Sequence, residues 1–319
     1  MNPRLLPLDP ANHAGHHMHA DERIWSETNC YIDLWVEVLH ALGHDPAPAT
    51  AAALSADFDG QQWSFLKFEP ADLRMLYGIE VAEMNLWRTV AEHVVQELAA
   101  GRLLTVEVDS FWLPDTLGTS YQTEHVKTTI VLNRMDFAGQ TAEYFHNSGY
   151  YRLDAQDFRG VFHLDGAPPQ VLPPYVEMVR LDRMHPLQPE AAVELARTHL
   201  ARRPSANPVA ALAHGVQRDL EWLRGGGLEV FHRWSFGVLR QCGASAELAA
   251  DLSTYLSAQG VADAGRAAAA FLGVAQGAKS VQFRLARAAA RGRPVAVAEE
   301  LGAMAQGWEL AVDTLAARL

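Results

Sequence analysis

The sequence predicts an α+β domain followed by an all-α domain. Two amphipathic helical patterns come first in the chain and short β-branched or aromatic runs follow them, an order typical of α+β domains rather than of alternating βαβ units. From about Pro186 onward the chain is rich in Ala and Leu, and 19 of the last 59 residues are Ala. Because Ala loses no side-chain entropy on becoming helical, this bias predicts a helical second domain.

The predicted α+β domain spans residues 21–182 and begins with helices. Apolar side chains recur at helical spacing over residues 31–42, and Gly43 follows as a suitable C-cap. A second apolar face predicts a helix over residues 81–100, with Gly101 after it.

Strands are predicted where the hydrophobic period changes. Residues 103–109, 128–133 and 142–146 are short runs rich in β-branched or aromatic side chains, and turn residues bound them. A turn at residues 135–140 would pair the second and third of these strands antiparallel. After a proline-rich stretch, residues 175–181 predict one more strand.

The predicted helical domain spans residues 183–319, with four or five helices from residue 187 onward. The first twenty residues are expected to form a mobile tail with little to bury. Four histidines lie in this tail, but composition alone is weak evidence for a metal site, and none is predicted there. The histidines of the tail are His13, His16, His17 and His19, and the expected helix breaks are residues 225–227, Gly243, Gly260 and Pro294.

The charge balance excludes several classes of protein. Lys and Arg number 26 against 38 Asp and Glu, for a formal charge of −12. Nucleic-acid binding needs clustered Lys and Arg, so an acidic chain is a poor candidate for it.

No apolar run approaches the roughly 20 residues needed to span a bilayer. Because the chain has only Cys30 and Cys242 and no secretory signal, a reducing cytoplasm is the expected compartment.

Cys30 is the sharpest chemical feature of the sequence. It stands at or near the N-terminus of the helix predicted over residues 31–42, where unpaired backbone N–H groups and the helix dipole favour a thiolate. A buried structural cysteine is the alternative interpretation. Cys242 lies in the helical domain with no base nearby in the sequence and is expected to be inert.

His125 and Asn147 supply what a thiol nucleophile needs, namely a base and a group that orients the base. His125 stands at the entry to a predicted strand, and Asn147 would lie beside it across the 135–140 turn. Cys on an early helix, His on a strand and Asn on the next strand is the chain order of papain-like enzymes, so a papain-like fold is expected. His146 stays open as either the functional histidine or a packed one.

Four segments carry a resemblance to known families. They are WSETNCYIDLWVEVLHALG at residues 25–43, VEVDSFWLPDT at 106–116, YQTEH at 121–125 and YFHN at 144–147. The pattern resembles an uncharacterised family of bacterial proteins that tend to be encoded near amino acid:carrier protein ligases. More distantly, it is similar to the N-terminal domain of butirosin biosynthesis protein H.

The resemblance to butirosin biosynthesis protein H implies a cysteine acyltransferase. In that family an aminoacyl group moves from a carrier-protein phosphopantetheine thioester to an amine. Carried over by position, the resemblance makes Cys30 the nucleophile, His125 the base and Asn147 the residue that orients it, where that family has Asp. It also implies two partners, a carrier protein that bears phosphopantetheine and a small-molecule amine acceptor, and it implies no bound metal or nucleotide.

Neighbouring residues extend this chemistry. The backbone N–H of Cys30, with Asn29 and Glu27 beside it, is the candidate oxyanion or positioning site. Carboxylates near the predicted site suit an aminoacyl ammonium group, although a strand-end turn explains the two aspartates equally well. The candidate substrate-binding residues are Asp109, Asp115 and Tyr121.

One helical stretch of the second domain concentrates positive charge, with Lys279, Arg284, Arg287, Arg291 and Arg293. It predicts either a dock for an acidic carrier protein or a solvated helix face. Three functions stay open: a transferase, a hydrolase (amidase, peptidase or thioesterase) with the same triad, and a non-catalytic module that binds a carrier protein or an amino acid.

Overall fold

The computed structural model describes residues 3–166 and 172–319. The chain divides into two compact units, and each is built from three segments. The first unit consists of Met1–Ala20, Cys30–Asp45 and Glu69–Pro186, and the second of Asp21–Asn29, Pro46–Phe68 and Leu187–Leu319. The mixed α+β character of the first unit and the helical character of the second confirm the predicted fold class at this level.

The first unit is built on a six-stranded antiparallel sheet in the order β1-β6-β2-β3-β4-β5. The strands predicted over 103–109, 128–133, 142–146 and 175–181 are all present, and β3 and β4 pair antiparallel as expected. The strands are β1 (Glu80–Glu83), β2 (Arg102–Asp109), β3 (Lys127–Asp136), β4 (Thr141–His146), β5 (Gly149–Asp154) and β6 (Val176–Arg180).

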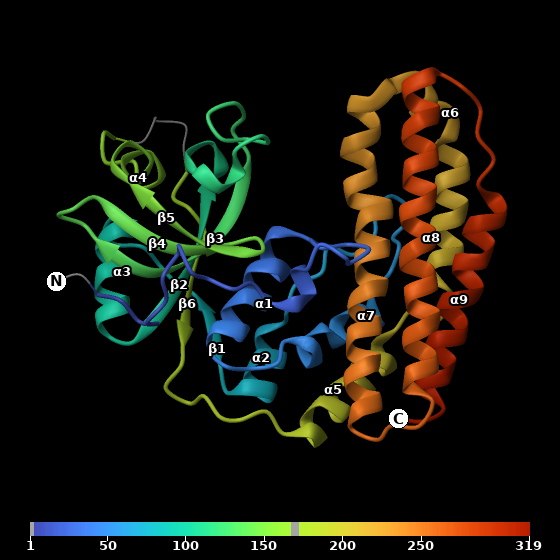
Figure 1. The fold of residues 1–319 in the computed structure, drawn as a ribbon, viewed down its shortest axis with the longest axis horizontal. Coiled ribbons are helices and arrows are strands. Elements are labelled where there is room, and N and C mark those ends of the chain that lie inside the picture. The colour runs from blue at the N-terminus through green and yellow to red at the C-terminus, as the bar shows by residue number, and fades with distance from the viewer. Residues whose placement is uncertain (1–2, 167–171) are drawn as a thin grey trace. The chain divides into compact units, whose positions relative to one another are not determined.

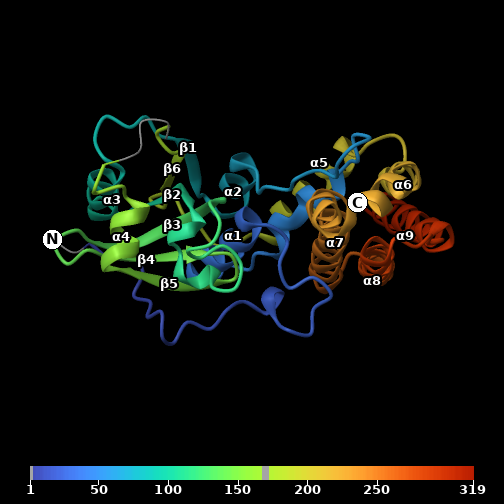
Figure 2. The same cartoon turned by 90° about the horizontal axis from the view of Figure 1, so that it is seen from above.

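Helices cover both faces of this sheet (Figures 1 and 2). Helix α1 (Cys30–Ala41), the helix predicted over 31–42, packs against β3, β4 and β5. Helix α3 (Val90–Ala99) packs against β2 and β3, and α4 (Ala155–Val161) packs near β4 and β5 on the same side as α3. Helix α2 (Pro70–Tyr77) completes the unit beside β1. The core therefore lies in two layers, one on each side of the sheet.

The helix predicted over residues 81–100 is wrong in its first half. Residues 80–83 form β1, the edge strand beside β6, and the helix starts only at Val90. Thr89 caps α3 by accepting a hydrogen bond from the N–H of Glu92, whose carboxylate bonds back to Thr89. Pairing with β6, a strand almost 100 residues later, overrides the local helical pattern. A prediction from neighbouring residues does not include so distant a partner.

The N-terminal segment, expected to be a mobile tail, instead contacts the first unit. Arg4 forms an ion pair with Glu143 at 2.6 Å, and the N–H of Leu5 bonds to the carbonyl of Asn133. Further along, His13 and His19 contact the two carboxylate oxygens of Glu37 on α1 at 2.8 Å and 2.6 Å. Glu37 is fully buried, so these histidines compensate the cost of burying its charge.

The second unit is helical, as predicted from its Ala-rich composition. Its breaks were predicted in part: Gly260 and Pro294 follow α7 and α8, whereas residues 225–227 make only a kink inside α6 and Gly243 lies within α7. The described helices are η2 (Ala47–Ser55), α5 (Pro189–Arg202), α6 (Pro208–Ser235), the π-helical turn η5 (Phe236–Arg240), α7 (Gln241–Ala258), α8 (Ala264–Arg291) and α9 (Ala298–Ala316).

Residues 21–29, expected in the first domain, pack against the helices of the second unit. Arg23 forms a bidentate pair with Asp251, and the indole N–H of Trp25 donates to the carbonyl of Ala275 at 3.1 Å. Gly243 on α7 permits this contact, because a Cβ there would lie 2.5 Å from Nε1 of Trp25. Long-range packing thus assigns the segment before α1 to the helical unit.

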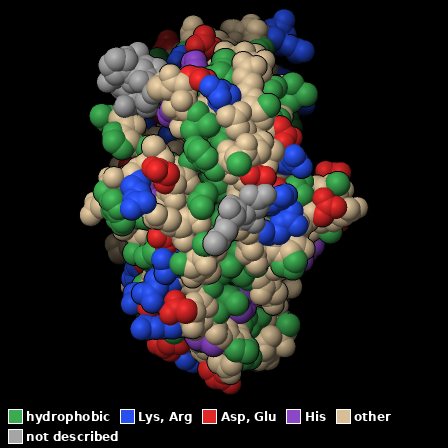
Figure 3. Space-filling model, turned by 90° about the vertical axis from the view of Figure 1, so that its left-hand side faces the viewer, with side chains coloured by type: hydrophobic (Ala, Val, Ile, Leu, Met, Phe, Trp, Pro, Cys, Tyr) green, Lys and Arg blue, Asp and Glu red, His purple; other side chains and the backbone are tan. Residues whose placement is uncertain are grey.

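Within the described residues, every helix is too short or too polar to cross a bilayer. On the face at the left of Figure 1, basic, acidic and hydrophobic side chains lie interspersed (Figure 3). This face therefore shows no continuous basic surface of the kind that nucleic-acid binding requires.

The Glu37 cluster predicts a specific pH dependence of stability. Burial opposes the charges, but the contacts with Asp33 and Glu37 outweigh it and raise the pKa of His19 to about 9. A raised pKa adds stability that is complete below pH 6.5 and is lost as the pH rises through 9. The free energy of unfolding should therefore fall by something on the order of 2 kcal/mol between pH 6.5 and 9.

Urea unfolding across this pH range tests the effect. His19→Gln should abolish the fall, whereas the control His17→Gln, which changes an exposed neighbour, should keep it. Equal pH dependence in wild type and His19→Gln would refute the assignment.

Candidate active site

Cys30 is the first residue of α1, as the sequence predicted, and is half-buried. This position places it at the N-terminal end of a 12-residue helix, which is the positive end of the helix dipole. Its sulfur makes no hydrogen bond to any residue that the structure describes, including His125. Cys242, by contrast, is completely buried in α7, and its burial raises the pKa of its thiol.

His125 pairs with Asp109. Its Nδ1 lies 2.5 Å from Oδ2 of Asp109, and its ring stacks on Phe111 with centroids 4.5 Å apart and planes 12° from parallel. Oδ1 of Asp109 accepts from the backbone N–H of Phe111, so one carboxylate bonds to both residues. The other ring nitrogen, Nε2, makes no hydrogen bond within the described part of the chain. The pair therefore has an oriented imidazole whose outer nitrogen is available.

Asp109 and His125 line a cavity of about 560 Å³. Strand β6 pairs with β2 only as far as Val106, so the cavity lies beside the last residues of β2, where this edge has no paired strand. Its walls are mainly apolar, and its volume falls in the range of small-molecule sites. The ionisable side chains on it include Glu107, Asp109, His125, Lys127 and His163, and the apolar ones include Val106, Val108, Phe162 and Pro173.

The start of α1 and the His125–Asp109 pair belong to the same face of the sheet. The hydroxyl of Tyr31, next to Cys30, donates to Glu177, and so does the hydroxyl of Thr105. Side chains alternate along a strand, so Asp109, four residues after Thr105 on β2, shares its face. The fold thus brings the first turn of α1 and the His125–Asp109 pair to one side of β2.

Asn147, predicted to orient His125, does not do so. It lies in the tight turn between β4 and β5 with φ +45°, a left-handed conformation that Asn adopts more readily than most residues. Among the described residues no hydrogen bond joins it to His125, and Asp109 holds the histidine instead. The prediction failed because β3 begins only at Lys127, so His125 lies beyond the paired part of the hairpin.

Asp115 and His146 form a second histidine–carboxylate pair, and it is buried. Nδ1 of His146 lies 2.5 Å from Oδ2 of Asp115, and its Nε2 lies 2.7 Å from the hydroxyl of Thr128. Tyr144 donates to the other oxygen of Asp115. Thr128 is the register partner of Val108, so this pair lies on the face of the sheet opposite α1. His146 is therefore a packed histidine, and Asp115 has no free oxygen for a substrate ammonium.

The remaining predicted site residues have other partners. Tyr121 donates to Asp157 at 3.0 Å and anchors the loop that leads to His125. The side-chain amide of Asn29 donates to the carbonyl of Leu66 at 3.1 Å, and Glu27 contacts Arg240 at 3.4 Å. These bonds position the segment before α1, and a carboxylate such as Glu27 has no proton to donate to an oxyanion.

Sequence reasoning missed two residues of the site. Glu177 accepts hydrogen bonds from Tyr31, Thr105 and Tyr175, and Lys127 pairs with Glu107 beside the cavity at 2.9 Å. A glutamate inside an apolar strand was a usable signal, because a buried carboxylate needs several donors. Only the strand register, however, shows which donors those are.

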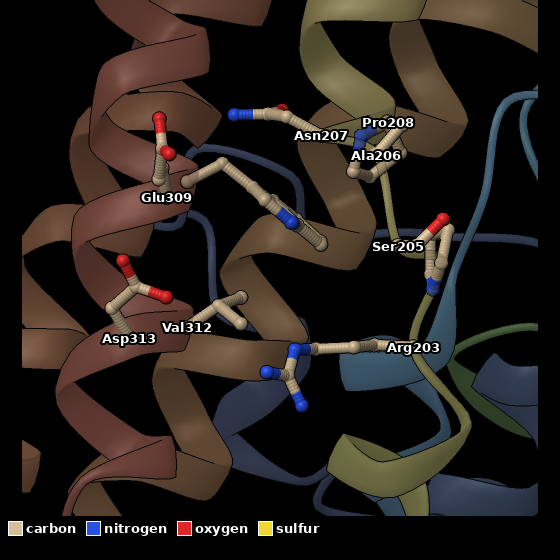
Figure 4. A pocket seen from close by; sticks show the side chains of 10 residues that line it. Arg203, Ser205, Ala206, Asn207, Pro208, Glu309, Val312 and Asp313 are labelled. Carbon is tan, nitrogen blue, oxygen red and sulfur yellow. The ribbon is translucent and has the colours of Figure 1, made fainter.

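The helical unit contains a smaller cavity of about 140 Å³ near the α5–α6 connection. Figure 4 shows Arg203 reaching from this connection toward α9, which carries Glu309, Val312 and Asp313. Liquid water occupies ~30 Å³ per molecule, so the space suits a few waters. It is smaller than the usual small-molecule site of roughly 300 Å³ or more.

The two histidine–carboxylate pairs should differ sharply in their effect on stability. Asp115→Ala leaves the buried His146 and Tyr144 without their shared acceptor, and we expect a loss of about 3 kcal/mol. Asp109→Ala breaks an exposed pair and one turn cap, and we expect about 1 kcal/mol. Urea unfolding of the two variants measures the difference, and equal losses would contradict the assignment of His146 as a packed residue.

Comparison with known proteins assigns most of the chain to one family. A model described as the DUF1839 N-terminal domain matches residues 14–181, and one described as the DUF1839 C-terminal domain matches residues 186–317. No curated protein shows significant similarity to the chain. The two models meet between residues 181 and 186, whereas contacts group residues 21–29 and 46–68 with the helical unit. The chain belongs to the uncharacterised DUF1839 family.

Proposed function

We propose that the protein is a cysteine-dependent acyl or aminoacyl transferase. Its donor is an aminoacyl thioester on the phosphopantetheine arm of a carrier protein, and its acceptor is a small-molecule amine. The observation that carries the proposal is the His125–Asp109 pair, an oriented imidazole with an available Nε2 at the edge of a largely apolar cavity. Such a histidine is suited to accept a proton from a thiol or an amine.

Cys30 is the proposed nucleophile. Its place at the start of α1 puts it at the positive end of the helix dipole, and its own backbone N–H is the proposed donor to an oxyanion. The arrangement of a cysteine at a helix start and a histidine in the loop just before a strand also underlies the papain-like comparison, which we retain as part of this proposal. Since no hydrogen bond links the two side chains, closure of the pair is expected on substrate binding.

The proposed reaction has two balanced steps. The Cys30 thiolate attacks the thioester carbonyl and a new C–S bond forms, while the C–S bond to phosphopantetheine breaks and its sulfur takes the proton held by His125 and leaves as the thiol. The acceptor amine then attacks the acyl-enzyme and gives its proton to His125, and the thiolate of Cys30 leaves. Asp109 keeps His125 in one orientation throughout.

The cavity beside β2 suggests where the acyl group is held. Val106 and Val108, which line it, point to the face of β2 opposite α1, whereas Glu107 lies on the same face as Asp109. A carboxylate there suits the ammonium of an aminoacyl group, although Lys127 already engages it.

Intact-mass analysis with alanyl-pantetheine thioester tests the proposal. We expect wild-type protein to gain one alanyl group on Cys30 and to release it to an added amine such as glycinamide. Cys30→Ala should gain none, and His125→Ala should react at least about 100-fold more slowly because it lacks the proton acceptor.

The matched control is Cys242→Ala, which removes the buried thiol and should acylate like wild type. Turnover that survives Cys30→Ala but not His125→Ala would refute the covalent route and leave His125 acting on the amine directly. Release of the alanyl group to water alone would favour the hydrolase. Unchanged donor binding with no acyl transfer in any variant would favour a non-catalytic binding module.

A further inference from the structure

A cluster of cations and aromatic rings lies on the helical unit, outside the candidate active site. It consists of Arg240, Lys279, Trp25, Phe236 and Phe283, and we call it the cation–aromatic patch. The ammonium of Lys279 lies 4.2 Å from the centre of the Trp25 ring and 6.0 Å from that of Phe283. The guanidinium of Arg240 lies 5.6 Å from the centre of the Phe236 ring. All five residues belong to the second unit.

The exposed residues of the patch lie on the π-helical turn η5 and on helix α8. Phe236 and Arg240 are the first and last residues of the π-helical turn η5, and such turns occur frequently at functional sites. Lys279 and Phe283 are four residues apart on α8, so they share one face of that helix. Lys279 is also the first of the five basic residues between positions 279 and 293, which we call the basic stripe.

The patch holds two positive charges with little compensation. Lys279 has no carboxylate within ion-pair distance among the described residues, and burial and the charge of Arg240 lower the pKa of its ammonium. Arg240 has only Glu27, at 3.4 Å, and its Nε has no hydrogen-bond partner in the described chain. Glu247 is near Lys279 but accepts from the N–H groups of Ile24 and Trp25. An anion would relieve the repulsion between the two cations.

The rest of the stripe differs from the patch. Arg284 pairs with Glu300, and its Nη2 donates to the carbonyl of Ala296. Arg287 and Arg291 are exposed on α8. By contrast, two exposed rings accompany the uncompensated cations, since Phe236 is 44% exposed and Phe283 is 53% exposed. An anion with an apolar group attached fits this combination better than a free inorganic ion.

We propose that the cation–aromatic patch binds the phosphopantetheine arm of the acyl donor, with Lys279 and Arg240 on the phosphate and the exposed rings against the branched pantoyl carbons. This assignment rests on the proposed function, because that function supplies the donor. Arg240 also contacts Glu27, which precedes Cys30 by three residues in the chain. The segment that leads into the candidate nucleophile is thus held by the same arginine.

Calorimetric titration with two matched probes tests the proposal. 4′-Phosphopantetheine and pantetheine differ only by the phosphate, so we expect the first to bind at least tenfold more tightly. Lys279→Gln and Arg240→Gln should each remove most of that difference. Phe283→Ala should weaken both probes to a similar extent, because its ring contacts the part that they share.

The control is Arg287→Gln, which removes the same charge from an exposed position on the same helix and should bind like wild type. Equal affinity for the two probes, or an equal loss in Lys279→Gln and Arg287→Gln, would overturn the proposal. Inorganic phosphate that binds as tightly as 4′-phosphopantetheine would overturn the assignment to the arm in favour of a general phosphate site.

The same titration in Cys30→Ala separates this proposal from the proposed function. Binding that persists in Cys30→Ala and is lost in Lys279→Gln supports the patch even if no acyl transfer occurs. Acyl transfer with full activity in Lys279→Gln and Arg240→Gln, at donor concentrations below saturation, would refute the patch while leaving the enzyme intact.

Discussion

The candidate site depends on the antiparallel pairing of β2 with β3. Their register places Asp109, the last residue of β2, opposite Lys127, the first residue of β3. The intervening loop of 17 residues therefore starts and ends at the same place, and His125 returns within reach of the carboxylate that the chain left 16 residues earlier. A shift of this register by one residue would turn the Asp109 side chain to the other face of the sheet and break its contact with His125.

The loop between these strands needs a rigid frame, and the buried Asp115–His146 pair provides one. Asp115 lies near the middle of the loop and is tied to His146 and Tyr144 on β4. Tyr121 adds a second anchor through Asp157. The two histidine–carboxylate pairs thus have complementary roles: the buried one holds the loop, and the exposed one presents an imidazole at its end.

Segments from far apart in the sequence complete both units. The N-terminal residues reach α1 through the histidines around Glu37, and residues 21–29 reach α7 and α8 through Arg23 and Trp25. Cys30 is the residue at which the chain passes from the second unit to the first. The residue before it, Asn29, is bonded to Leu66 within the second unit.

Local pattern was enough to predict the α+β and helical character, α1, four of the six strands and the place of Cys30 at a helix start. Each of these follows from the hydrophobic period or from composition, which neighbouring residues determine. Pairing of distant segments decided the rest: β1 in place of a helix, Asp109 rather than Asn147 beside His125, and the buried state of His146. The sequence shows which residues are able to form hydrogen bonds and ion pairs. Strand register and chain packing determine which of these contacts form.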